Sequence, residues 1–195
     1  MQNLERRISK ANAGQLITEY LQLVEQVGNP VANLKGRPLL WALKREPLKA
    51  GPYPGLTLFE AANRIMSDLV ILYGVKWLLD HNVFPFGTYT VEYGNEDKSG
   101  FDIRANADGR TLIGEAFNVA RSFFQGKKTA MLKKLRQSGD SADYKIIMFN
   151  HDAVEGSYEP EPKTSEFFVF VQVGTEDSYM MPKRLHPSGP GASGG

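Results

Sequence analysis

The sequence predicts an α/β protein in which helices pack on a mixed central sheet, preceded by an N-terminal helical extension. From residue 57 onward, the patterns follow the order helix, three strands, helix, strand, strand. The turn pair Asp108-Gly109 joins the second strand to the third. With 195 residues, of which 42% are hydrophobic, the chain can bury one full core.

Residues 1–56 are expected to form the extension, a helical segment followed by a basic arm. Apolar side chains between 3 and 27 recur at helical spacing, and the pattern ends at Gly28-Asn29-Pro30, which predicts one helix or two. Residues 29–56 are rich in proline and in basic side chains, including Lys44 and Arg45. We expect a connecting arm there, with a short helix around 39–44.

The core is expected over 57–185. Thr57 and Glu60 have the spacing of a capping box, which predicts a helix over 58–81. The later elements are a strand at 89–93, the two strands of the hairpin within 101–120, a helix at 123–137 opened by a second capping signal at Ser122 and Gln125, and strands at 144–150 and 166–173. Residues 186–195 lack apolar side chains and are expected to be a flexible tail.

Composition restricts the possible functions. The sequence has no cysteine, which excludes disulfides and thiolate metal sites, so carboxylates are the best-supplied metal ligands. There is no run of eighteen apolar residues, and the N-terminal MQNLERRISK lacks the apolar stretch of a signal peptide. We therefore expect a cytoplasmic protein without a membrane span.

Charge is distributed unevenly along the chain, although the formal net charge is only +1. Segment 121–136 contains six basic residues and no acid, whereas acidic side chains predominate between 92 and 108. An acidic centre beside a basic helix suits a polyanion that is cleaved with the help of a cation. The alternative is that the basic helix simply presents a solvated face.

The hairpin places two acids opposite each other. If Asp108 and Gly109 form a two-residue turn, Ala107 faces Arg110 and, counting outward, Asp102 faces Glu115. Like charges in that position destabilise a sheet, and a divalent cation such as Mg²⁺ would make the pair tolerable. Two alternatives remain: a solvated face that carries both acids, and a longer loop that shifts the register.

The order of elements and the placement of these acids resemble the PD-(D/E)XK nuclease superfamily, which has the restriction-endonuclease-like α-β-β-β-α-β core. The resemblance covers about residues 57–173, with Phe101-Asp102 at the Pro-Asp position and Glu115-Ala116-Phe117 at the (Asp/Glu)-X-Lys position. It implies that Asp102 and Glu115 bind Mg²⁺ or Mn²⁺. It also implies metal-dependent hydrolysis of DNA, most specifically by a type II restriction-like endonuclease.

The motif lysine is missing, because Phe117 stands in its place. Lys128 lies inside the apolar stripe of helix 123–137, four residues after Phe124, and a lysine facing the sheet there would reach the acids. Lys127 is the neighbouring candidate. The alternative is that both side chains extend to solvent at the edge of the stripe.

The resemblance also suggests other contributors. Many members of the superfamily add an acid from the helix before the sheet, for which Glu60 is the candidate, although its role in the capping box competes. The residues expected to contact DNA are Arg121, Lys133 and Lys134, together with Lys44 and Arg45 of the arm. Cleavage of a duplex favours a two-fold homodimer. A different hypothesis is an inactive module of the same fold that binds nucleic acid or a protein.

Overall fold

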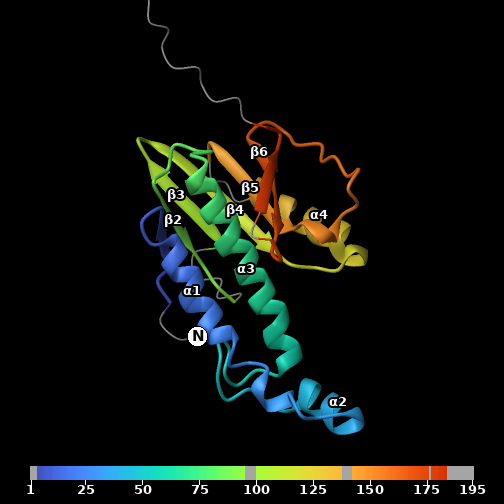
Figure 1. Cartoon of the computed structure of the whole chain (residues 1–195). Coiled ribbons are helices and arrows are strands. Elements are labelled where there is room, and N and C mark those ends of the chain that lie inside the picture. The colour runs from blue at the N-terminus through green and yellow to red at the C-terminus, as the bar shows by residue number, and fades with distance from the viewer. Residues whose placement is uncertain (1–3, 95–99, 138–141, 176, 184–195) are drawn as a thin grey trace, which may run out of the picture.

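The computed structural model describes residues 4–94, 100–137, 142–175 and 177–183. Helices and one strongly curled sheet make up the fold (Figure 1). The helices are α1 (Ala13–Val24), α2 (Gly36–Arg45), α3 (Leu58–Asp80) and α4 (Arg121–Gln137), with short 3₁₀ turns at Asn29–Val31 and His151–Ala153. The strands are β1 (Arg7–Ser9), β2 (Thr88–Val91), β3 (Ile103–Ala107), β4 (Arg110–Phe117), β5 (Tyr144–Asn150), β6 (Glu166–Gln172) and β7 (Asp177–Met181).

The seven strands lie in the sheet in the same order as in the chain. Strands β1 to β4 are antiparallel neighbours, β4, β5 and β6 run parallel, and β7 returns antiparallel to β6. The parallel step from β4 to β5 requires a crossover, which α4 provides. The predicted α/β class with a mixed sheet and preceding helices is therefore confirmed.

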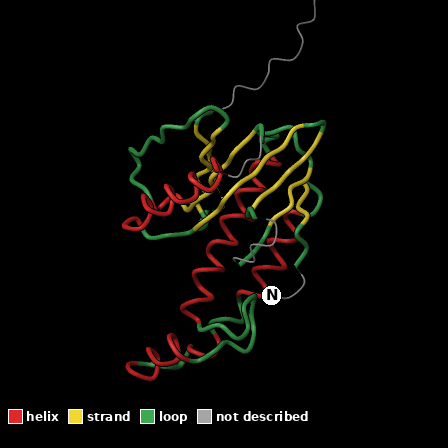
Figure 2. The backbone as a smooth tube through the Cα atoms, turned by 180° about the vertical axis from the view of Figure 1, so that it is seen from behind, coloured by secondary structure: helices red, strands yellow, loops and turns green. Residues whose placement is uncertain are grey.

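The sheet separates two hydrophobic clusters, with α1 and α3 on one face and α4 on the other (Figure 2). On one face, α1 and α3 pack against side chains such as Ile146 and Met148 of β5. On the other face, α4 packs against the alternate residues Ile147 and Phe149. Burial on both faces explains why the centre of β5, residues 146–149, is a continuous apolar run in the sequence.

The N-terminal extension differs from the predicted helix over 3–27, because Arg7–Ser9 forms edge strand β1. Ile8 pairs with Tyr89 of β2 and is fully buried. The side chain of Asn12 ends the strand: its oxygen accepts the N–H of Ser9 at 2.8 Å, and its amide donates to the carbonyl of Arg7 at 2.9 Å. A buried isoleucine fits either a helix or a strand, so its spacing did not separate the two.

Helix boundaries confirm one capping prediction and contradict the other. The box of Thr57 and Glu60 is formed in both directions at the start of α3. The second signal is wrong, because α4 begins at Arg121 and Ser122 already lies in its first turn. The short helix expected at 39–44 is present as α2, strand β7 was not predicted, and the expected tail at 186–195 lies outside the described residues. Within the described residues, no helix is both long and apolar enough to cross a membrane.

A buried carboxylate attaches the extension to the core. Asp68 of α3 is fully buried and accepts hydrogen bonds from the hydroxyls of Tyr20, at 2.6 Å, and Tyr53. Its other oxygen accepts the N–H of Gly94 at 3.0 Å. Burial raises the pKa of Asp68 to about 6, and these donors oppose the rise. One side chain thus joins α1, the segment before α3 and the end of β2.

We expect Asp68→Ala to lower the free energy of unfolding by about 3 kcal/mol or more, because two buried hydroxyls lose their acceptor. Tyr20→Phe removes a single donor and should cost about 1–3 kcal/mol. Asn63→Ala, at an exposed position on the same helix, should stay within about 0.5 kcal/mol of wild type. Urea unfolding followed by circular dichroism measures all three. Equal midpoints for Asp68→Ala and wild type would show that Asp68 is no anchor.

Candidate active site

Asp102 and Glu115 lie side by side on neighbouring strands, as the hairpin count predicted. Ile103 pairs with Gly114, so Asp102, which directly precedes β3, lies opposite Glu115 of β4. The Asp102 carboxylate is also held by the backbone of β4, because its Oδ2 accepts the N–H of Ala116 at 2.8 Å. Glu115 is only 2% exposed. The acids therefore do not lie on a solvated face.

Burial makes both carboxylates harder to ionise. It raises the pKa of Asp102, an effect opposed by the N–H of Ala116 and by the charges of Lys134 and Lys127. Burial and the nearby charge of Asp102 raise the pKa of Glu115 to about 7 from an ordinary value of 4.5, with Lys134 again opposing the rise. The charged form of both acids is therefore disfavoured by burial, and a bound cation would offset that cost.

Lys134 of α4 supplies the nearest positive charge. Its Nζ lies 2.8 Å from Glu115 Oε1 and forms an ion pair with it. The same ammonium lies 5.6 Å from the centroid of the Phe101 ring. Lys127, seven residues earlier, lies on the same face of α4 and also contributes positive charge at both acids. A lysine from the helix thus reaches the acids.

The lysine in contact with Glu115 is not Lys128 but Lys134, a residue expected from the sequence to contact DNA. The Lys128 ammonium donates to the hydroxyl of Tyr158 at 3.0 Å and lies 5.6 Å from the centroid of the Phe124 ring. Phe117, at the position of the motif lysine, is buried and stacks on Phe149. The spacing of Lys127 and Lys134 was the sequence signal that would have identified this face.

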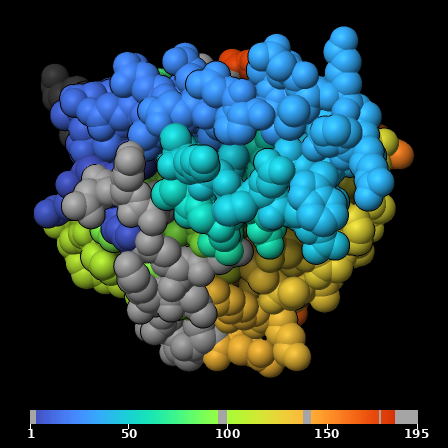
Figure 3. All heavy atoms as spheres, turned by 90° about the horizontal axis from the view of Figure 1, so that it is seen from below, coloured from blue at the N-terminus to red at the C-terminus, as the bar shows by residue number. Residues whose placement is uncertain are grey.

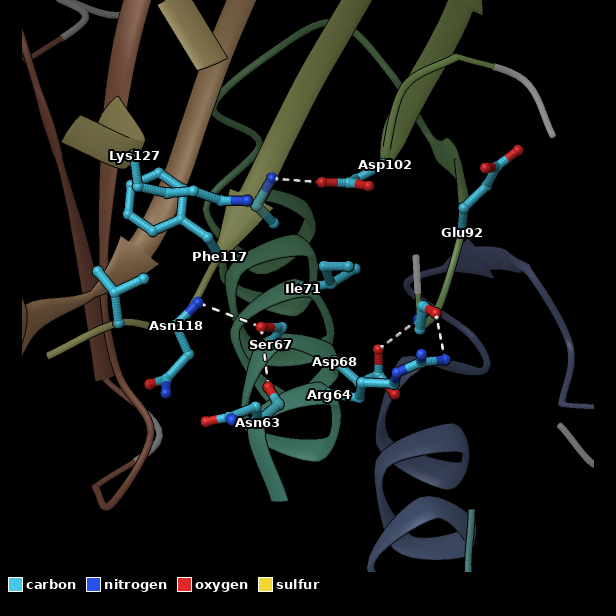
Figure 4. A pocket seen from close by; sticks show the side chains of 13 residues that line it. Asn63, Arg64, Ser67, Asp68, Ile71, Glu92, Asp102, Phe117, Asn118 and Lys127 are labelled. Atoms are coloured by element: carbon cyan, nitrogen blue, oxygen red, sulfur yellow. Dashed lines mark hydrogen bonds between the residues drawn. The ribbon is translucent and has the colours of Figure 1, made fainter. Parts of the chain in front are cut away.

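Asp102 lines a small open pocket of about 190 Å³, shown in Figure 4, whereas Glu115 is not among its lining residues. Three further segments reach it. Asp68 comes from α3, Glu92 follows β2, and Lys127 comes from α4. Glu92 is 8% exposed, and its charge raises the pKa of Asp102. Negative charge is therefore concentrated where α3, α4 and the ends of β2 and β4 meet.

The other predicted residues lie outside this pocket. Glu60 is exposed, and its carboxylate accepts the N–H of Thr57 at 3.1 Å. The acid of α3 that lines the pocket is instead Asp68. A guanidinium nitrogen of Arg121 lies 3.5 Å from Glu155 Oε1, which forms an ion pair. Lys133 lines a separate open groove beside Phe101. Lys44 and Arg45 are the last two residues of α2.

The carboxylates of Asp102 and Glu115 are the candidate ligands for a metal ion at this site. Among the described residues, no three acidic or histidine side chains are grouped closely enough to hold a metal ion. Two carboxylates are nevertheless a common protein contribution to Mg²⁺, with water and phosphate oxygens completing the shell. Asp102 Oδ1 and Glu115 Oε2 have no hydrogen bond to another described residue, so both remain available. The residues present therefore fit a hard divalent cation.

Glu115→Gln should change how stability depends on pH. A raised folded-state pKa stabilises the fold below about pH 4.5, and this contribution is lost as the pH rises through about 7. Relative to wild type, the variant should gain about 2–3 kcal/mol of unfolding free energy between pH 4.5 and pH 8 in EDTA. Urea unfolding across this range measures the difference. Glu155→Gln, on an exposed carboxylate, is the control, and parallel curves for Glu115→Gln and wild type would contradict the raised pKa.

Comparisons of the chain with protein families, with curated proteins and with solved structures find no match. A function therefore has to be inferred from the side chains themselves.

Proposed function

We propose that the protein is a metal-dependent nuclease that hydrolyses phosphodiester bonds in DNA, with the acid pair as its active site. The observation that carries the proposal is the facing pair of Asp102 and Glu115 with Lys134 in contact. The element order α3, β2, β3, β4, α4, β5 supports it, because this is the order of the restriction-endonuclease-like core that the sequence resembles. A type II restriction-like enzyme is the specific form that we favour.

The acid pair would hold Mg²⁺ or Mn²⁺ through Asp102 and Glu115. When bound, the cation supplies Lewis-acid polarisation of the phosphate and lowers the pKa of water. The hydrogen bond from Ala116 to Asp102 fixes one carboxylate relative to the backbone of β4. Burial of Glu115 excludes competing water and strengthens its electrostatic interactions.

Lys134 would take the role of the missing motif lysine. Its ammonium is already adjacent to the acids, and its side chain is 38% exposed, so it can turn toward a phosphate once a cation pairs with Glu115. A positive charge placed there stabilises the charge that develops on the phosphate in the transition state. Lys127 lines the pocket beside Asp102 and would bind the neighbouring phosphate.

The basic residues around the site suit a duplex substrate. Lys133, beside Lys134 on α4, would contact the phosphate backbone without reading sequence. Cleavage of both strands by one site per chain requires two copies related by a two-fold axis, so we propose a homodimer on DNA.

Wild-type protein should cleave plasmid DNA in Mg²⁺ or Mn²⁺ and lose the activity in EDTA. Asp102→Asn and Glu115→Gln should each reduce cleavage at least about 100-fold, because each removes a charge from the reaction centre. Gel electrophoresis of the plasmid gives the rates, and Glu155→Gln is a control on an exposed acid. Full activity in both pair variants would exclude this site. No cleavage by wild type would favour the inactive binding module instead.

Two variants should show whether Lys134 or Lys128 of α4 acts in cleavage. Lys134→Met removes the ammonium beside Glu115 and should slow cleavage about 100-fold. Lys128→Met leaves the acid pair unchanged, because Lys128 bonds Tyr158, and should stay within a few-fold of wild type. Single-turnover cleavage of a labelled duplex measures the chemical step. The opposite ranking would return the role to Lys128.

A further inference from the structure

Helix α2 presents an exposed face in which apolar and basic side chains are mixed. Arg37, Leu40, Trp41 and Lys44 follow the spacing of one helical face. Leu40 is 64% and Trp41 is 57% exposed, whereas Ala42 on the opposite face is buried. Large apolar side chains held in solvent on a short helix cost free energy unless a partner covers them.

The exposed face continues onto the start of α3. Phe59 is 52% exposed, and the Lys44 ammonium lies 3.3 Å from the centroid of its ring. Arg45 lines the same open hollow, together with Thr57 and Glu60. Cations and aromatic rings therefore alternate over one surface. We name the set Arg37, Leu40, Trp41, Lys44, Arg45 and Phe59 the α2 face.

We propose that the α2 face is a second contact for DNA, separate from the acid pair, in which the cations bind phosphates and Trp41 packs against exposed bases or a groove wall. The proposal rests on the proposed function, which makes DNA the substrate. Arg37 and Arg45 are eight positions apart, about 12 Å along a helix axis. The major groove is also about 12 Å wide, so the two ends of α2 can contact phosphates on both strands.

Charge complementarity favours this partner over a second copy of the chain. In a two-fold interface, the basic α2 face would meet its own copy, which brings cations against cations. Three exposed apolar side chains also cover far less than the roughly 800 Å² per partner of a stable protein interface. DNA supplies phosphates that complement the cations of the α2 face. Figure 3 shows α2 (light blue) exposed on the same side of the molecule as part of α4 (yellow), so one duplex can reach both.

Tryptophan fluorescence tests the proposal without requiring cleavage. The chain has two tryptophans, Trp41 and Trp77, and Trp77→Phe leaves Trp41 as the single reporter. The full-length Trp77→Phe protein is titrated in EDTA with a mixed-sequence 20-base-pair duplex, and Kd is measured in parallel by anisotropy of the labelled duplex. Quenching or a shift of the Trp41 emission that saturates with the anisotropy change is the expected result.

Substitutions in otherwise wild-type protein then assign the contact. Trp41→Ala should weaken binding to the duplex several-fold, because the packing of its exposed ring against the groove wall is lost. Arg37→Gln and Arg45→Gln should each lower the slope of log Kd against log salt by about 1. Lys76→Gln, an exposed lysine near the opposite end of α3, should change neither quantity.

Each outcome separates this proposal from the proposed function. If DNA binds without changing the Trp41 emission, and Trp41→Ala leaves Kd unchanged, the second contact is overturned. The cleavage tests of the proposed function are not affected by that result. Binding through Trp41 without any cleavage supports the contact and rejects the nuclease. An emission shift with phosphatidylserine vesicles but not with DNA overturns the proposal in favour of a membrane surface.

Discussion

The two-residue turn of the β3–β4 hairpin is the constraint on which the candidate site depends. Asp108 and Gly109 both have positive φ, 49° and 73°, the backbone that a tight turn with twisted strands requires. One added residue would slip the pairing and move Glu115 to the α3 face of the sheet, away from Lys134. Gly114 preserves the register on the other side of β4, because a Cβ there would lie 2.4 Å from Ile146 of β5. Backbone geometry at the turn thereby sets the pairing of two carboxylates that lie six residues, or about 20 Å of extended chain, away from it.

Hydrogen bonding distinguishes the buried acids from one another. Asp68 accepts two hydroxyls and one N–H, so its charge is satisfied within the fold and its role is structural. Asp102 has a single backbone donor, and Glu115 has only the ion pair with Lys134. Burying such a pair costs stability, because desolvation of two like charges is only partly offset. A fold that tolerates this cost is consistent with a ligand that supplies the missing positive charge, which is why the acid pair and not Asp68 is the candidate site.

Patterns that depend on neighbouring residues were predictable from the sequence, and those that depend on packing were not. The hairpin register followed from one turn, and the capping box of Thr57 and Glu60 followed from a local spacing. Strand β1 was not predictable, because only pairing with β2 distinguishes its buried Ile8 from a helical residue. The rotation of α4 about its axis decides between Lys128 and Lys134, and Leu135 and Phe124 set that rotation by entering the core. Because both lysines lie close to the apolar stripe, the sequence alone did not resolve which one faces the acids.

Phe117 has a physical role in this arrangement beyond the absence of a lysine. Its ring packs between Phe124 of α4 and Phe149 of β5, at centroid distances of 6.1 Å and 5.8 Å. The aromatic contact with Phe124 fixes the first turns of α4 against the sheet, and the position of α4 in turn sets where Lys134 meets Glu115. A lysine at 117 would place an ammonium in an apolar cluster and loosen the helix that carries the replacement charge. Under the proposed function, the catalytic lysine therefore comes either from position 117 of β4 or from α4. The aromatic ring at 117 holds α4 where Lys134 can supply that charge.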